Sequence, residues 1–152
     1  GFSLACVGVM MVVVQGGLTP WVVPRIGTTR AAIIGLVFSV IGYVGYAASP
    51  FGWIMYVVIV PHALSGFAIP AMQSIMTGQV GPGSQGELQG AIGSANGLAA
   101  MMGPPLMTVL FGVFSNREAA YYFPGAAFIA AAILTLVGLV VLLRALRQGK
   151  GA

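Results

Sequence analysis

The residues able to carry chemistry in this sequence are few, and a single histidine stands out among them. His62 lies in a long apolar stretch, and an imidazole exchanges protons near neutral pH. Two interpretations stay open for it: a buried neutral ring hydrogen-bonded to a backbone carbonyl, or a proton relay. The acidic residues are Glu87 and Glu118, and neither lies inside a long apolar segment. Any proton coupling must therefore rest mainly on groups elsewhere.

Uncharged polar side chains recur at helical spacing within two apolar stretches. His62 and Gln73 belong to a series of residues spaced three or four apart, which would lie on one face of a helix. Gln89 and Asn96 belong to a similar series further along the chain. Polar groups inside a membrane are costly unless they face protein or a cavity. We expect Gln73 and Asn96 either to hydrogen-bond a neighbouring helix or to contact a substrate. Further candidates to line such a cavity are Gln15, Ser39, Tyr43 and Tyr46.

No catalytic or metal-binding constellation is present in the sequence. It lacks a pair of acids, a nucleophile with a base, and any ligand spacing for a metal. Cys6 is the only cysteine, so no intrachain disulfide can form, and we expect it to act as a small apolar residue. The sequence argues against an enzyme and predicts no cofactor and no metal.

The composition is that of an integral membrane protein. Hydrophobic residues make up 59% of the chain and charged residues 5%, whereas soluble domains carry about a quarter charged residues. The formal net charge is +4, but the basic residues lie near the ends of apolar segments instead of clustering on one stretch. This placement excludes a nucleic-acid-binding surface and indicates membrane topology.

Five apolar segments predict membrane-spanning helices, each needing about 20 residues to cross the bilayer. We place them at about 2–18, 31–48, 53–77, 88–113 and 123–143, followed by a basic tail at 145–152. Because lipid offers no hydrogen-bond partners, the fold class is all-α, a polytopic membrane domain over residues 1–144. The chain opens directly inside an apolar segment, so we expect it to be a fragment of a longer protein.

The basic residues also predict an orientation. Arg25, Arg30, Arg144, Arg147 and Lys150 fall on one side of five alternating helices, and Arg117 falls on the other. The positive-inside rule places the loops at 20–30 and 78–87 and the C-terminus in the cytoplasm.

Local patterns suggest where helices begin and bend. Ser84 with Glu87 fits a capping box, which favours a cap over a proton carrier for that carboxylate, and Ser115 with Glu118 fits another. We expect Trp53, Tyr121 and Tyr122 at the membrane interfaces. Pro61 and Pro70, with Gly66 between them, predict a kink in the segment at 53–77.

Small residues recur along the segment at 88–113 and just before it. Glycines four apart let helices approach closely in a membrane. We expect these glycines to pack against a neighbour, and the same smooth face could slide during a conformational change. They are Gly86, Gly90, Gly93, Gly97 and Gly103.

Several of these motifs together resemble the second half of the tetracycline/proton antiporters of the major facilitator superfamily. IPAMQ at 69–73, QGELQG at 85–90 and GPPL at 103–106 resemble the tenth and eleventh helices of that family. The start at 1–5 resembles its eighth helix, and Arg25-x-Gly27-x-x-Arg30 resembles a worn copy of the cytoplasmic signature loop. QGELQG with its flanks is fairly specific to the subfamily, whereas the other motifs are generic.

The resemblance implies that the chain is the last five of about twelve helices, from a C-terminal half whose N-terminal half is missing here. It implies an antiporter in a bacterial inner membrane that exports a drug-like molecule in exchange for protons. Gln73, Gln89 and Asn96 would then line or brace a central cavity, and Arg25, Gly27 and Arg30 would hold the cytoplasmic gate.

Two positions depart from the family pattern. Ser39 stands where the family places an acidic residue, and Met11 stands where it places a histidine. His62 could compensate for the missing groups. Two alternatives to drug export stay open: a transporter of an ordinary metabolite, and a membrane module that does not transport.

Overall fold

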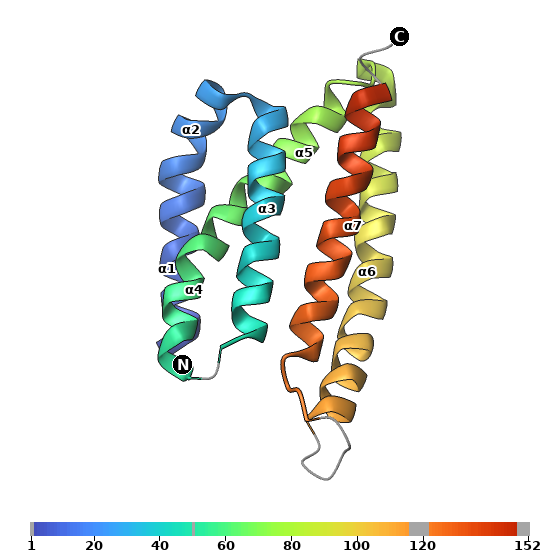
Figure 1. Ribbon diagram of the computed structural model, residues 1–152. Coiled ribbons are helices and arrows are strands. Elements are labelled where there is room, and N and C mark those ends of the chain that lie inside the picture. Colours follow the sequence, from blue (N-terminus) through green and yellow to red (C-terminus); the bar gives the residue numbers. More distant parts are fainter. Residues whose placement is uncertain (1, 50, 116–121, 149–152) are drawn as a thin grey trace.

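In the computed structural model, which describes residues 2–49, 51–115 and 122–148, the described chain is helical and contains no strand (Figure 1). Five helical stretches are long and apolar enough to cross a membrane. They are Val7–Ile26, Thr28–Ala47, Gly52–Thr77, Pro82–Phe114 and Ala126–Gln148. This confirms the predicted all-α polytopic fold.

Three of the five spans are composite. The first joins α1 (Phe2–Val12), a π-helical segment η1 (Val13–Leu18) and α2 (Thr19–Ile26), and the next span is α3 (Thr28–Ala47). The third joins α4 (Gly52–Leu64), a 3-10 turn η2 (Ser65–Phe67) and α5 (Ala68–Thr77). A second 3-10 turn, η3 (Pro82–Ser84), leads into α6 (Gln85–Phe114), and α7 (Ala126–Gln148) is the last.

The first span does not end at Leu18 as predicted, and no loop covers 20–30. The helix continues to Ile26, and Gly27 alone separates it from α3. Pro20 lies in the first turn of α2, where its missing N–H group costs little, and the Thr19 hydroxyl donates a 2.8 Å hydrogen bond to the carbonyl of Val14. Proline therefore starts a helical segment here instead of a loop.

The last two spans also differ from the predicted bounds. α7 continues to Gln148, into the stretch predicted as a tail, because its last turns consist of leucine, arginine and alanine, which favour helix. α6 begins at Gln85, but Ser84 makes no side-chain cap hydrogen bond. Its backbone (φ −102°, ψ 2°) completes the preceding 3-10 turn instead of adopting the extended cap conformation. The predicted capping box is therefore not formed.

Some predicted features lie at the edges of the described residues. Ser115 follows the end of α6, whereas Arg117, Glu118, Tyr121 and Lys150 fall outside the described residues. Trp53 and Tyr122 are exposed next to helix ends, as amphipathic rings at an interface would be.

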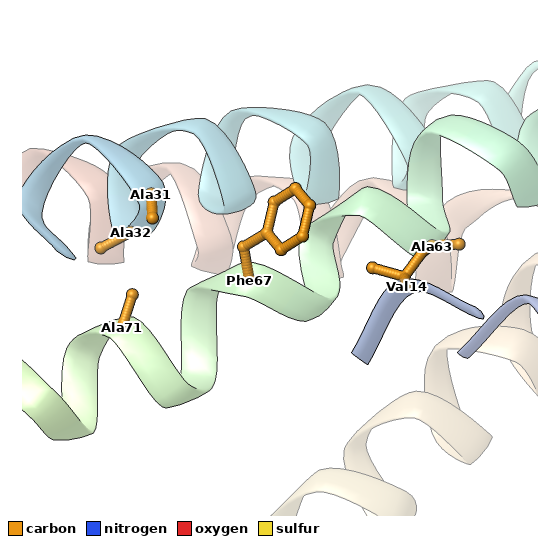
Figure 2. Packing of buried hydrophobic residues seen from close by; sticks show 6 residues of the cluster. All are labelled: Val14, Ala31, Ala32, Ala63, Phe67 and Ala71. Carbon is orange, nitrogen blue, oxygen red and sulfur yellow. The ribbon is translucent and has the colours of Figure 1, made fainter. Parts of the chain in front are cut away.

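The core is built from small side chains around α3, which packs against α7, α4 and α5. Its buried cluster consists of Val14, Ala31, Ala32, Ala63, Phe67 and Ala71. Figure 2 shows these side chains, with the ring of Phe67 pointing from η2 toward α3. Since four of the six are alanines, the helix backbones approach closely, which is how helices associate in lipid.

One end of the bundle collects the basic side chains. The α2–α3 connection, the α5–α6 connection and the end of α7 lie together at the top of Figure 1, opposite the N-terminus. Arg25 and Arg30 lie at the α2–α3 connection, and Arg144 and Arg147 lie in the last turns of α7. These four arginines therefore lie at the same end of the bundle, as the alternating direction of the predicted helices required.

Candidate functional site

The irregular segments of the first and third spans meet each other. A Cβ placed on Gly66 of η2 would lie 3.5 Å from Cγ1 of Val14 and 3.6 Å from Cγ of Gln15, both in η1. Pro20 and Pro70 follow these segments and cannot donate the helical hydrogen bond to the preceding turn. Irregular backbone at membrane depth is tolerated only where protein covers it or where it lines a cavity. The predicted kink near Gly66 is thus a 3-10 turn that faces a second break.

His62 lies in a ring cluster between α4 and α3. Its ring centroid is 5.0 Å from that of Tyr43 and 5.3 Å from that of Tyr46, and Tyr46 lies 5.5 Å from Phe128 of α7. The Nδ1 atom is buried and has no hydrogen-bond partner. The carbonyl hydrogen bond expected for a neutral buried histidine is therefore not formed at Nδ1, and this side of the ring lies close against Gly42 of α3.

The glycines that make close helix contacts are not those the sequence indicated. Nothing described lies within 4 Å of a Cβ placed on Gly86, Gly90, Gly93, Gly97 or Gly103. Their packing partner is thus not found in the described part of the chain. On α3, by contrast, such an atom on Gly35 would lie 2.9 Å from Cβ of Ala68, and one on Gly45 would lie 2.8 Å from Cγ1 of Val58.

A spacing signal for the α3 glycines was present but missed. Gly35 and Gly42 are seven residues apart, and Gly42 and Gly45 are three apart, so all three share one helix face. That face lies against α4 and α5, and it sets how closely His62 approaches α3.

The polar residues proposed to line a path are exposed on the described chain, except for two on α3. Gln15, Gln73, Gln89 and Asn96 are exposed, whereas Ser39 and Tyr43 are half-buried. Among the described residues, no interhelical side-chain hydrogen bond forms at Gln73 or Asn96, so both expectations for these amides, a hydrogen bond to a neighbouring helix and contact with a substrate, stay predictions. These amides are therefore free to meet a ligand or another part of the protein.

Tyr43 also borders an open apolar cavity that the sequence did not indicate. The cavity has a volume of about 620 Å³ and lies between α3, α6 and α7. Besides Tyr43, it is lined by Met107, Thr108, Phe111, Ala127, Phe128 and Ala131. Since Tyr43 contacts His62 and Phe128 contacts Tyr46, the ring cluster adjoins this cavity. Volume and lining are within the usual range for small-molecule sites, roughly 300–1,000 Å³.

The residues predicted to form a gate surround one glycine. Gly27 has φ 85° and ψ 151°, a conformation essentially restricted to glycine, and Arg25 and Arg30 flank it on α2 and α3. The Arg25 guanidinium carbon lies 3.7 Å from the centroid of the Trp21 ring, which holds that side chain along α2. No cluster of histidine, cysteine or acidic residues in the described ranges could bind a metal ion.

Comparison with known proteins identifies a protein family that this chain matches. A family model described as Major Facilitator Superfamily matches residues 1–151. The tetracycline resistance protein, class C, of Escherichia coli is 31% identical over 98% of the chain, and the class G protein of Vibrio anguillarum is 30% identical over 95%. Hippocampus abundant transcript-like protein 1 of Bos taurus is 25% identical over 73%.

The matches cover only part of the relatives. The chain spans 35% of the class C protein, 35% of the class G protein and 22% of the bovine protein. No solved structure matches the chain significantly.

Proposed function

The chain belongs to the Major Facilitator Superfamily, and we propose that it forms the C-terminal part of a proton-coupled exporter of tetracycline-like or other amphipathic drugs. The observation that carries the proposal is the contact between η1 and η2, each of which interrupts a helix long and apolar enough to cross a membrane. Broken helices and unsatisfied backbone groups recur where transporters bind their substrates.

The translocation path is proposed along the exposed polar residues near these breaks. Gln15 lies at the contact itself, and Gln73 lies on α5 beyond it. Gln89 and Asn96 lie on α6, a 30-residue helix in which no residue is buried. Because an apolar helix this exposed needs a partner, we expect the remainder of the transporter to cover α6. The glycines from Gly86 to Gly103 would then form its packing or sliding surface.

His62 is proposed as a proton relay. It is the one histidine in the sequence, and its ring joins Tyr43 at the edge of the 620 Å³ cavity. No acidic residue lies within the five described spans except Glu87 in the first turn of α6, and positions 39 and 11 lack the family's acid and histidine. A ring that can exchange protons near neutral pH is the remaining candidate.

The arginine-flanked Gly27 is proposed as a cytoplasmic gate element, with the protein in a bacterial inner membrane and its C-terminus inside. Four arginines at one end of the bundle support this orientation by the positive-inside rule.

A second candidate is transport of a different small molecule. The substituted positions Ser39 and Met11 favour this alternative.

Transport by the full-length protein in inside-out vesicles under an imposed proton gradient tests both candidates. We expect gradient-dependent accumulation of tetracycline or of an amphipathic dye. Accumulation of neither, while an ordinary metabolite is carried, would support the second candidate. Absence of all transport from well-folded protein would favour a membrane module without transport activity.

A further inference from the structure

A mixed polar and apolar hollow lies at the arginine-rich end of the bundle, away from the proposed path. It has a volume of about 370 Å³ and lies between the start of α3, the end of α7 and the turn after α5. Thr29, Gln79 and Arg147 supply its polar groups, and Ile33, Leu143 and Leu146 supply apolar ones. Figure 1 shows the beginning of α3 and the end of α7 at the same end of the molecule.

A second, smaller hollow continues the first along α7. It has a volume of about 170 Å³ and is lined by Val140, Leu143, Arg144 and Arg147, so that Leu143 and Arg147 border both. Arg144 and Arg147 are three residues apart and share one helix face. Two guanidinium groups therefore lie beside an apolar strip that runs from the helix end toward the membrane interior.

The local charge is unbalanced. Neither arginine has an ion-pair partner among the described residues. Glu87, the acidic residue at this end within the described ranges, lines a different hollow with Val80 and Ser84. The site therefore favours an anion.

We propose that this hollow binds an anionic phospholipid, with the phosphate on Arg144 and Arg147 and an acyl chain along Ile33, Leu143 and Leu146. Guanidinium groups suit phosphate because they can donate two parallel hydrogen bonds to it. Thr29 and Gln79 offer further hydrogen-bonding groups for the glycerol or headgroup. A soluble anion would gain nothing from the apolar strip, whereas a lipid at a helix end presents both chemistries together.

Lipid retention by the full-length protein tests the proposal. The purified protein is titrated with phosphatidylglycerol, phosphatidylcholine or inorganic phosphate, and bound molecules are counted by native mass spectrometry. We expect saturable binding of phosphatidylglycerol and weaker binding of phosphatidylcholine. The single substitutions Arg144→Gln and Arg147→Gln should each weaken phosphatidylglycerol binding about fivefold.

Two further variants distinguish lipid binding inside the hollow from general electrostatic attraction between the arginines and anionic lipid. Ala145→Phe fills the 370 Å³ hollow without changing the charge and should also weaken phosphatidylglycerol binding. Arg25→Gln is the matched control, since that arginine lies at the same end but stacks on Trp21 and lines neither hollow. It should bind as the wild type does.

Three results would overturn the proposal. Equal losses in Arg25→Gln and Arg147→Gln would mean nonspecific electrostatic attraction. Unchanged binding in Ala145→Phe would mean that no lipid enters the hollow. Saturable binding of inorganic phosphate that displaces phosphatidylglycerol would assign the arginines to a soluble anion. None of these results depends on transport activity, so they are separable from failure of the proposed export function.

Discussion

Gly42 of α3 lies directly against the side chain of His62 of α4. A Cβ placed on Gly42 would lie 2.7 Å from Cβ of His62 and 2.8 Å from its Cγ, closer than real Cβ contacts. The absence of a side chain at position 42 therefore fixes the distance between the two helices. It also buries the Nδ1 atom of His62 without a partner.

Substitution Gly42→Ala should destabilise the fold. The added methyl group must push either His62 or the α3 backbone aside, and overpacking of this kind typically costs about 1–3 kcal/mol. The measurement is the free energy of unfolding in detergent micelles. Gly138→Ala on α7 is the matched control, because nothing described lies within 4 Å of a Cβ there. That change should be neutral or stabilise by about 0.5–1 kcal/mol through helix propensity. Equal effects of the two substitutions would contradict the close contact.

Gly27→Ala should also cost stability, for a backbone reason. Its φ of 85° with ψ of 151° is a region that residues with a side chain avoid, at a cost of roughly 1–3 kcal/mol. Gly81→Ala serves as control, since Gly81 has φ −67° and ψ 162° and nothing within 4 Å of an added Cβ. Thermal unfolding of both variants checks this prediction. A stable Gly27→Ala with unchanged transport would remove this glycine from the proposed gate.

Pro70→Ala should strengthen the third span while slowing transport. The new N–H group can donate to the carbonyl of Gly66, and a hydrogen bond of this kind contributes about 0.5–1.5 kcal/mol net. A straighter span would lose the break that contacts η1. Thermal unfolding and initial transport rates measure the two effects. Pro61→Ala is the comparison, because α4 passes through Pro61 without interruption. Transport slowed equally by both changes would argue against a special role for the break at Gly66.

His62→Gln should flatten the pH dependence of transport by the full-length protein, because an imidazole can exchange protons with its surroundings. Glutamine retains hydrogen-bonding capacity but cannot exchange a proton in this way. Tyr46→Phe keeps the neighbouring ring and removes only its hydroxyl group, so its pH profile should match the wild type. An unchanged profile in His62→Gln would end the proposal that His62 relays protons.

The sequence alone determined the membrane fold. Apolar runs with charges confined to their ends leave helices as the only way to satisfy the backbone in lipid, so the five spans could be predicted. The motifs at 69–73 and 85–90 indicated the family because they are local in the chain and do not depend on packing. The alternation of Arg25, Arg30, Arg144 and Arg147 followed from counting helices.

Only the tertiary structure decided which small residues make contacts. The glycine pattern of α6 is the more regular in sequence, yet Gly35, Gly42 and Gly45 of α3 make the close approaches, because α3 lies at the centre of the described bundle. Periodicity identifies a smooth face but does not identify what lies opposite it. For the same reason, the His62 ring cluster, the contact of Gly66 with Gln15, and the hollow beside Arg147 could not be read from the sequence. Each depends on side chains from helices far apart in the chain.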